Sequence, residues 1–124
     1  MSPSADPVTS QLADALRIAA RAESLLVATD FDGVLAPFHI DPMAVRPTPG
    51  GLEALRQLAS LPGTHVAVVS GRDLDTLRAL TAIAEDEPIV LIGSHGAESS
   101  SDAVRAAMET ATVSPEDDAR LTAI

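Results

Sequence analysis

The chain has 124 residues and a mass of 12.8 kDa, which is the size of one domain, and its 46% hydrophobic content excludes a disordered protein. The net charge of −10 leaves no basic surface for phosphate backbones or anionic lipids, so we expect neither nucleic acid nor membrane as a partner. Cysteine is absent, which excludes disulfides, zinc–thiolate sites and cysteine nucleophiles, and all 8 basic residues are arginine. The first ten residues do not resemble a signal peptide, so we expect a cytoplasmic protein.

Apolar periodicity predicts helices and strands that alternate along the chain. Three short apolar runs are typical of buried parallel strands, over 24–30, 64–70 and 89–93. Helices are predicted from a cap at Thr9 or Ser10 to about Glu23, from a cap at Thr48 to Pro62, from a cap at Asp73 through Leu80, weakly over 100–110, and from a cap at Ser114 to the chain end. Loops are predicted over 31–47 and 94–98, and the acidic loop 85–87 is expected to be solvated.

This alternation predicts the α/β class, with right-handed crossovers and a three-layer, Rossmann-like parallel sheet that has helices on both faces. In such sheets, ligands bind beyond the carboxyl ends of the strands. All three predicted strands end in polar residues: Asp30 with Asp32, Ser70 with Arg72, and Ser94 with His95. The sequence therefore predicts a functional site at this edge of the sheet.

The first strand end carries two carboxylates, Asp30 and Asp32, followed by Gly33. Two nearby carboxylates can hold a hard divalent cation, with water and a phosphate completing its shell. One can attack phosphorus as a nucleophile, while the other donates a proton to the leaving oxygen and then activates water. Gly33 lets the backbone approach a phosphate closely. The structural alternative is an Asx turn that merely closes the strand.

Three segments resemble one known family. DFDGVLAPF is similar to the first motif of the haloacid-dehalogenase superfamily of phosphohydrolases, and VAVVSGR resembles its second motif in the version of the trehalose-6-phosphate phosphatases. GSHGAE, at 93–98, resembles a signature of that phosphatase family at the matching distance. The resemblance covers roughly 24–98. It implies a haloacid-dehalogenase-like core and magnesium-dependent hydrolysis of trehalose 6-phosphate through an aspartyl-phosphate, as part of trehalose biosynthesis.

Matched position by position, the resemblance implies that Asp30 is the phosphorylated nucleophile. It implies that Asp32 is the general acid and base, that its backbone carbonyl ligates magnesium together with Asp30, and that Ser70 hydrogen-bonds the phosphoryl group. Phosphate or substrate contacts are implied for Gly33, Arg72, Ser94, His95 and Glu98. Residue chemistry alone leaves bland alternatives open for four of these: a turn cap for Ser70, a solvated charge for Arg72, a turn residue for His95, and surface charge or a cap for Glu98.

The chain departs from the family pattern because it has no lysine for the third motif, and the acidic pair Asp117–Asp118 is typical of helix capping. The interpretation is an N-terminal arm and helix over 1–23, a phosphatase core half over 24–98, and a segment over 99–124 that leads into a missing cap domain. We therefore expect an incomplete form, little activity in isolation, and a first strand whose exposed edge favours self-association. Two alternatives remain open: a non-catalytic module of the trehalose pathway that pairs with a partner subunit, and a phosphatase of another sugar phosphate.

Overall fold

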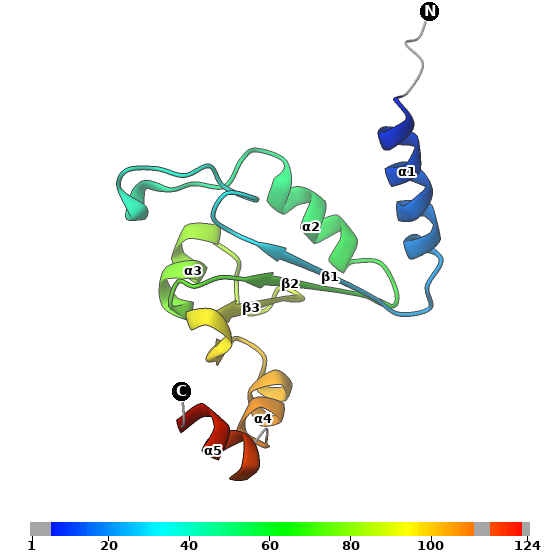
Figure 1. Cartoon of the computed structure of the whole chain (residues 1–124). Coiled ribbons are helices and arrows are strands. Elements are labelled where there is room, and N and C mark those ends of the chain that lie inside the picture. The colour runs from blue at the N-terminus through cyan, green and yellow to red at the C-terminus, as the bar shows by residue number, and fades with distance from the viewer. Residues whose placement is uncertain (1–5, 111–114, 123–124) are drawn as a thin grey trace, which may run out of the picture.

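The computed structural model describes residues 6–110 and 115–122, and it has the predicted α/β class (Figure 1). Helices and strands alternate from α1 to β3. The helices are α1 (Pro7–Ala20), α2 (Gly51–Ala59), α3 (Leu74–Thr81), α4 (Asp102–Thr110) and α5 (Pro115–Thr122). The strands are β1 (Leu25–Asp30), β2 (Thr64–Val69), β3 (Ile89–Gly93) and the two-residue β4 (Glu98–Ser99), and short 3-10 turns occupy Pro42–Ala44 and Ser94–Gly96.

The four strands form one sheet in the order β1-β2-β3-β4. β1 pairs with β2, and β2 with β3, in parallel, which confirms the prediction for the three long strands. Strand β1 is the edge strand of this sheet, as expected. β4 pairs antiparallel with β3, through Ile92 opposite Ser99, so the predicted loop 94–98 was wrong at its end. Two residues are too few to show an alternating pattern, which is why the sequence did not reveal β4.

The hydrophobic core lies on one face of the sheet. Val66 and Val68 of β2 and Leu91 of β3 are at most 2% exposed there. Leu55 of α2 and Leu77 of α3 belong to the same buried cluster, so both helices cover this one face. Phe31, directly after β1, is completely buried in the cluster, so the core extends to the sheet edge where the functional site was predicted.

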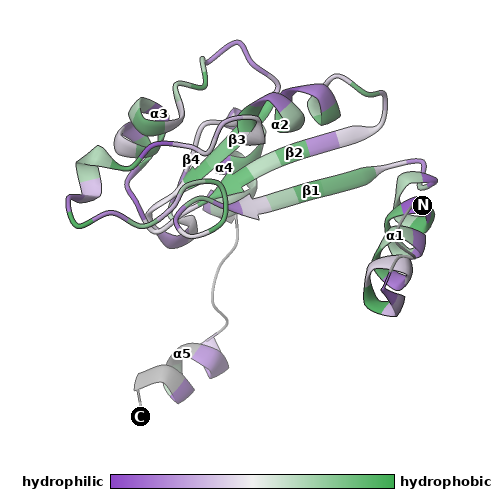
Figure 2. Cartoon of the chain, turned by 90° about the horizontal axis from the view of Figure 1, so that it is seen from above, coloured by the Kyte–Doolittle hydropathy of each residue, from purple (hydrophilic) through white to green (hydrophobic). Residues whose placement is uncertain are grey.

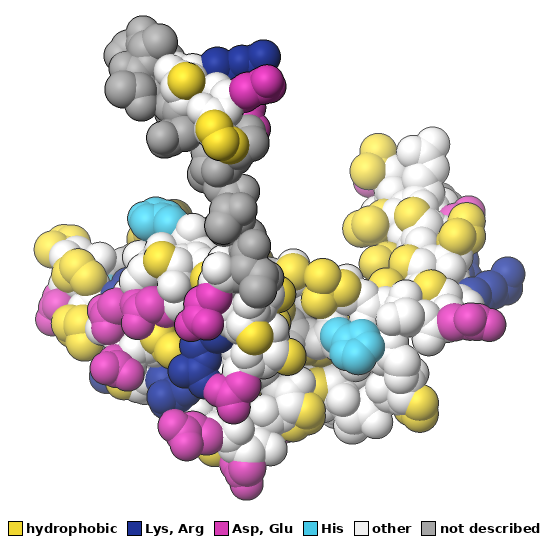
Figure 3. Space-filling model, turned by 90° about the horizontal axis from the view of Figure 1, so that it is seen from below, with side chains coloured by type: hydrophobic (Ala, Val, Ile, Leu, Met, Phe, Trp, Pro, Cys, Tyr) yellow, Lys and Arg dark blue, Asp and Glu magenta, His cyan; other side chains and the backbone are white. Residues whose placement is uncertain are grey.

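The opposite face of β1 and β2 is open, although helices were expected on both faces. Leu26 is 66% exposed there, and the side chain of His65, its partner in the register, is also exposed. Apolar side chains lie on this side of the molecule, which faces away from α2 (Figure 3). Helix α1 buries none of its residues and projects from the sheet beside the start of β1, where its apolar stripe stays exposed (Figures 1 and 2).

Helix starts differ from two of the predictions. α1 begins earlier, because the Asp6 carboxylate accepts a hydrogen bond from the Val8 amide and Pro7 occupies the first position. The predicted cap at Thr48 was wrong: α2 follows Gly50, whose φ of +90° suits glycine, and no side chain caps it. The cap at Asp73 is confirmed, since its carboxylate accepts from the Thr76 amide. The predicted cap Ser114 lies outside the described residues.

Glu87 is not merely solvated, in contrast to the expectation for its acidic loop. The Arg56 Nε donates to Glu87 Oε1 at 2.6 Å, and the Ala84 amide donates to Oε2 at 2.7 Å. The guanidinium of Arg56 and, secondly, this amide lower the pKa of Glu87. The pair ties α2 to the segment before β3.

Within the described part of the chain, no helix has the length and apolar character to cross a membrane.

Candidate active site at the carboxyl ends of the strands

The carboxyl ends of β1 and β2 and the turn after β3 meet around one open pocket, called here the Asp30 pocket. It has a volume of about 530 Å³ and is lined by Ala28, Thr29, Asp30, Val69, Ser70, Gly71 and His95. The Asp30 side chain is exposed to this pocket, and its Oδ1 accepts a hydrogen bond from the Phe31 amide at 2.7 Å. That bond fixes the carboxylate at the strand end.

Ser70 and His95 lie across the pocket from β1 and are held by backbone contacts. Ser70 is 4% exposed, its amide donates to the Ile92 carbonyl, and its Oγ accepts from the Arg72 amide at 3.1 Å. The His95 amide donates to the Ser70 carbonyl at 3.1 Å. The His95 ring lies on Gly71 so closely that a Cβ there would be 2.5 Å from a ring carbon. Gly71 therefore makes room for the imidazole.

Asp32 and Arg72 form an ion pair beside this pocket. Arg72 Nε donates to Asp32 Oδ2 at 2.9 Å and Nη2 donates to Oδ1 at 2.7 Å, which is bidentate geometry. The side chains are 27% and 16% exposed, respectively. The hydrogen bonds from Arg72 lower the pKa of Asp32, and the carboxylate in turn raises the pKa of the guanidinium. Neither residue lines the Asp30 pocket.

Ser94 and Glu98 form a third group at the start of α3. Ser94 Oγ donates to Glu98 Oε1 at 2.5 Å, and the Leu74 amide donates to the same oxygen at 3.3 Å. Glu98 thus places negative charge at a helix N-terminus, where it is favourable. Ser94 and His95 have φ values of 49° and 54°, a left-handed conformation that non-glycine residues rarely adopt. Such strain is concentrated at functional sites.

The loop 31–47 adds residues that sequence reasoning missed. The Phe38 ring lies over Gly33, where an added Cβ would be 2.8 Å from it, and Gly33 has a φ of +81°. Phe38 is nevertheless 80% exposed and Ile40 is fully exposed. The Pro42 carbonyl accepts from Arg72 Nη1 at 2.8 Å. Phe38 could have been noticed, because it is one of only two aromatic residues in the chain.

The donor set for a metal ion is small. The described residues contain no group of three His, Cys, Asp or Glu side chains placed to hold one. The Asp32 carboxylate is occupied by Arg72, which leaves the Asp30 carboxylate and the Asp32 backbone carbonyl. These are hard oxygen donors of the type magnesium prefers, and magnesium keeps several waters in such sites. The residues therefore fit magnesium in type, as a weak site.

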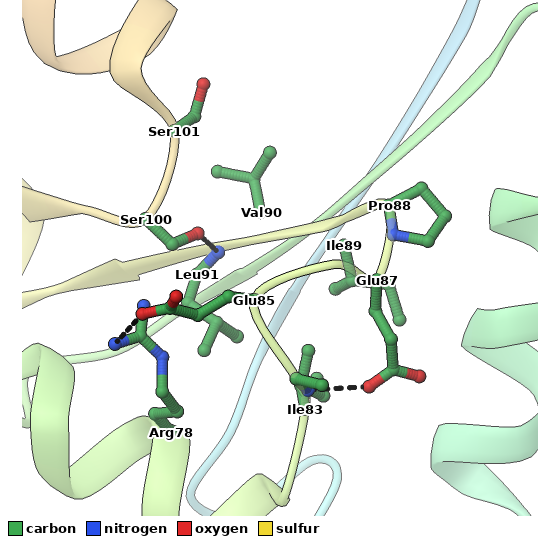
Figure 4. Close-up of a pocket in the computed structure, with 11 residues that line it drawn as sticks. Arg78, Ile83, Glu85, Glu87, Pro88, Ile89, Val90, Leu91, Ser100 and Ser101 are labelled. Atoms are coloured by element: carbon green, nitrogen blue, oxygen red, sulfur yellow. Dashed lines mark hydrogen bonds and ion pairs between the residues drawn. The ribbon is translucent and has the colours of Figure 1, made fainter.

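A second cavity, of about 240 Å³, contains none of the predicted site residues (Figure 4). Its lining includes apolar residues of β3 and the polar side chains of Arg78, Glu85 and Ser100. Arg78 Nη1 lies 3.4 Å from Glu85 Oε1, and Ser100 Oγ accepts from the Leu91 amide at 2.8 Å. It is thus separate from the Asp30 pocket.

Comparison with known proteins points to one family. The sequence model of the trehalose-phosphatase family matches residues 28–120. The trehalose-phosphate phosphatase of Mycobacterium leprae is 41% identical over 98 residues, which cover 73% of this chain and 21% of that protein. The Mycobacterium tuberculosis protein of the same name is 40% identical over 94 residues, covering 72% and 23%.

Solved structures agree with the sequence matches. The trehalose-6-phosphate phosphatase of Aspergillus fumigatus superimposes with a TM-score of 0.58 at 30% identity, covering 77% of this chain and 33% of that one. The C-terminal domain of the C. albicans trehalose-6-phosphate phosphatase gives 0.56 at 26% identity, covering 64% and 26%. The chain spans about a fifth of the length of the curated relatives it matches.

Proposed function

Because this chain belongs to the trehalose-phosphatase family, we propose that it carries the nucleophile of a magnesium-dependent phosphatase of the haloacid-dehalogenase superfamily. The proposed reaction is hydrolysis of trehalose 6-phosphate to trehalose and phosphate, with the enzyme located in the cytoplasm. The observation that carries the proposal is the exposed Asp30 carboxylate, which opens into a pocket with Ser70 and His95. This arrangement supports nucleophilic attack on a phosphate at the strand edge.

In the proposed mechanism, the Phe31 amide holds Oδ1 of Asp30, and Oδ2 is the oxygen that attacks phosphorus. A phosphorus–oxygen bond to Asp30 forms while the bond to the sugar oxygen breaks. The sugar leaves with a proton from Asp32, which must first take up that proton from solvent against its bonds to Arg72. Water then attacks the aspartyl-phosphate, Asp32 takes a proton from that water, and phosphate leaves. Magnesium, bound by the Asp30 carboxylate and the Asp32 carbonyl, would supply positive charge for the phosphoryl oxygens.

Ser70 and Gly33 are the proposed phosphate contacts, because Ser70 lines the Asp30 pocket and Gly33 follows the acidic pair. His95 is the proposed substrate contact on the other side of the pocket. Ser94 and Glu98 are proposed to act from the start of α3, where Glu98 keeps its second carboxylate oxygen for a sugar hydroxyl. Arg72 contributes charge next to Asp32, since its guanidinium is bound there.

The test is phosphorylation of Asp30 by trehalose 6-phosphate and magnesium, followed by mass spectrometry of the peptide that contains it. We expect an Asp30-dependent label with little sustained phosphate release. The chain has no lysine to stabilise the transition state, and loss of one such donor costs about 10²–10³ in rate. Asp30→Asn should abolish the label, whereas Asp75→Asn, an exposed carboxylate of α3, should keep it. A label that survives Asp30→Asn would contradict the mechanism.

The open face of the sheet favours a second candidate function, that of a non-catalytic interaction module. The exposed Leu26 and the unpaired edge of β1 would then pair with a second copy or with a partner subunit. Light scattering over a range of concentrations tests self-association, and a clean monomer at high concentration would contradict it. A third possibility, a phosphatase of another sugar phosphate, is tested by offering glucose 6-phosphate in the labelling experiment.

A further inference from the structure

Arg72 is bound on several sides at the site. Its guanidinium contacts both oxygens of Asp32, at 2.9 and 2.7 Å, and its Nη1 donates to the Pro42 carbonyl at 2.8 Å. Its Cζ lies 5.8 Å from the centre of the buried Phe31 ring, within reach of a cation–π contact. With only 16% of the side chain exposed, this arginine is not a free surface charge.

This geometry fixes two things at once. A carboxylate held by two parallel N–H groups has one orientation, so Arg72 sets where the Asp32 side chain lies. The Pro42 carbonyl belongs to the 3-10 turn of the loop 31–47, so the same guanidinium ties that loop to the end of β2. We propose that Arg72 is a positioning residue, which holds the Asp32 carboxylate and the loop 31–47 together at the strand edge.

The positioning of Asp32 by Arg72 is independent of the proposed function, but its effect on a reaction rests on that proposal. In the proposed phosphatase, Arg72 would act through Asp32 by placing the acid and base. Lysine could not take this part, because an ammonium group is a point charge without the planar fork that matches a carboxylate. The arrangement also compensates the charge of Asp32, one of the two carboxylates at and just after the end of β1. An approaching phosphate then meets less negative charge than the sequence DFD alone implies.

The first experiment follows arginine side chains of the 124-residue chain by ¹⁵N NMR. Hydrogen exchange at Arg72 Nε–H is expected to be about tenfold to a hundredfold slower than at Arg17, as a charge-assisted hydrogen bond protects it. Arg17 is a suitable reference, because its pair with Asp14 uses Nη1 and is about 70% exposed on both sides. Exchange at Arg72 as fast as at Arg17 would overturn the proposal.

The second experiment measures the side-chain rotamers of Asp32 from coupling constants of its β-protons. We expect Asp32 to occupy one rotamer in the wild type and to average between rotamers in Arg72→Gln. In Arg72→Lys, the single rotamer should be restored only in part. Arg56→Gln is the matched control, since it removes a comparable Arg–carboxylate pair away from the site and should leave the Asp32 rotamer unchanged. A fixed Asp32 rotamer in Arg72→Gln would refute the positioning role.

The third experiment follows backbone amide exchange of Met43 and Ala44, which lie in the tied turn. Exchange should become about tenfold faster in Arg72→Gln, from loss of the bond to Pro42. Arg46→Gln is the control: Arg46 bonds to the Met43 and Val45 carbonyls, so its loss should loosen the loop without releasing Asp32. If Arg72→Gln does not fold, Asp32→Asn replaces it, and Arg72 Nε–H should lose its protection.

These readouts need no catalysis, so they separate this inference from the proposed function. If Asp30 is not phosphorylated but Arg72 is protected and Asp32 is fixed, then the positioning holds and the phosphatase proposal fails. If Asp30 is phosphorylated while the Asp32 side chain averages between rotamers in the wild type, then the phosphatase proposal stands and Arg72 is no positioning residue.

Discussion

The two faces of the sheet have similar apolar residues but differ in what covers them. On the packed face, Val66, Val68 and Leu91 lie under α2 and α3 and are almost completely buried. On the open face, Leu26 is 66% exposed and Val69 is 36% exposed. Both sets come from the same apolar runs in the sequence. The comparison shows that the position of the helices decides which strand side chains are buried, and the hydrophobicity of the strands alone does not predict it.

The difference also has a physical meaning for function. Parallel strands are normally apolar on both sides because both faces are covered. An apolar open face next to an edge strand is the type of surface through which chains associate. The packed face therefore holds the fold together, and the open face is the surface on which the proposed partner contact depends. The predictions below test this division, in order of expected effect.

The largest effect is expected for Leu77→Ala on the packed face. Leu77 is completely buried under the sheet, so its truncation should cost about 2–5 kcal/mol in the free energy of unfolding. Leu12→Ala on α1, where the side chain is 57% exposed, is the matched control and should change it by less than about 0.5 kcal/mol. Urea unfolding followed by circular dichroism measures both. Equal effects would remove the distinction between the packed and open regions.

Gly63→Ala tests the turn between α2 and β2, where the Gly63 carbonyl accepts a hydrogen bond from the Leu25 amide at the start of β1. Gly63 has a φ of +75°, and an added Cβ would overlap the Glu23 carbonyl oxygen. Left-handed strain costs about 1–3 kcal/mol, and the collision adds to it. Gly50→Ala is the control, because Gly50 has a φ of +90° but open space around it. We expect Gly63→Ala to lower the thermal midpoint more than Gly50→Ala, and the reverse order would contradict the described turn.

Much of this fold could be predicted from the sequence, because local signals there agree with tertiary structure. The strand over 89–93 and the cap at Asp73 depend on nearby residues alone and were predicted correctly. The start of α2 was missed since Gly50 interrupts an otherwise good capping pattern at Thr48. The polar strand ends were visible in the sequence, and parallel topology brought Asp30, Ser70 and His95 to one pocket.

What the sequence could not show is pairing between distant residues. Arg72 and Asp32 are 40 positions apart, and Arg56 and Glu87 are 31 apart. Each of these side chains has a plausible local explanation as a solvated charge, so only the three-dimensional arrangement selects its partner. The open face was hidden for the same reason, because the strand pattern does not tell which helix covers which side.

Glu87→Gln is expected to change the acid dependence of stability at the rim of the packed face. Arg56 keeps the pKa of Glu87 in the folded protein below its ordinary value of 4.5. The folded state therefore binds a proton less readily than the unfolded state, so the pair stabilises the fold above pH 4.5 and this contribution is lost as the pH falls through the lower, folded pKa. Both partners are partly exposed, so the effect should stay below about 1 kcal/mol. Thermal midpoints between pH 7 and 3 should fall less steeply in Glu87→Gln than in the wild type, and equal slopes would contradict a contribution of the pair.

The smallest effect on stability is expected for Leu26→Ser on the open face. Its side chain is already 66% exposed, so little apolar area returns to water on unfolding, and the free energy of unfolding should change by less than about 0.5 kcal/mol. The same change should weaken association, because Leu26 is the large apolar side chain of the edge strand that points away from the core. Light scattering should show a smaller average mass for Leu26→Ser than for the wild type at equal concentration. Val8→Ser, at a 70% exposed position near the start of α1, controls for the general loss of an apolar side chain and should leave the average mass unchanged. If Leu26→Ser lowers stability as much as a core truncation, then this face is covered in solution, most simply by a second copy that buries Leu26. If instead neither stability nor average mass changes, the open face contributes nothing to association, and the proposal of an interaction module loses its support.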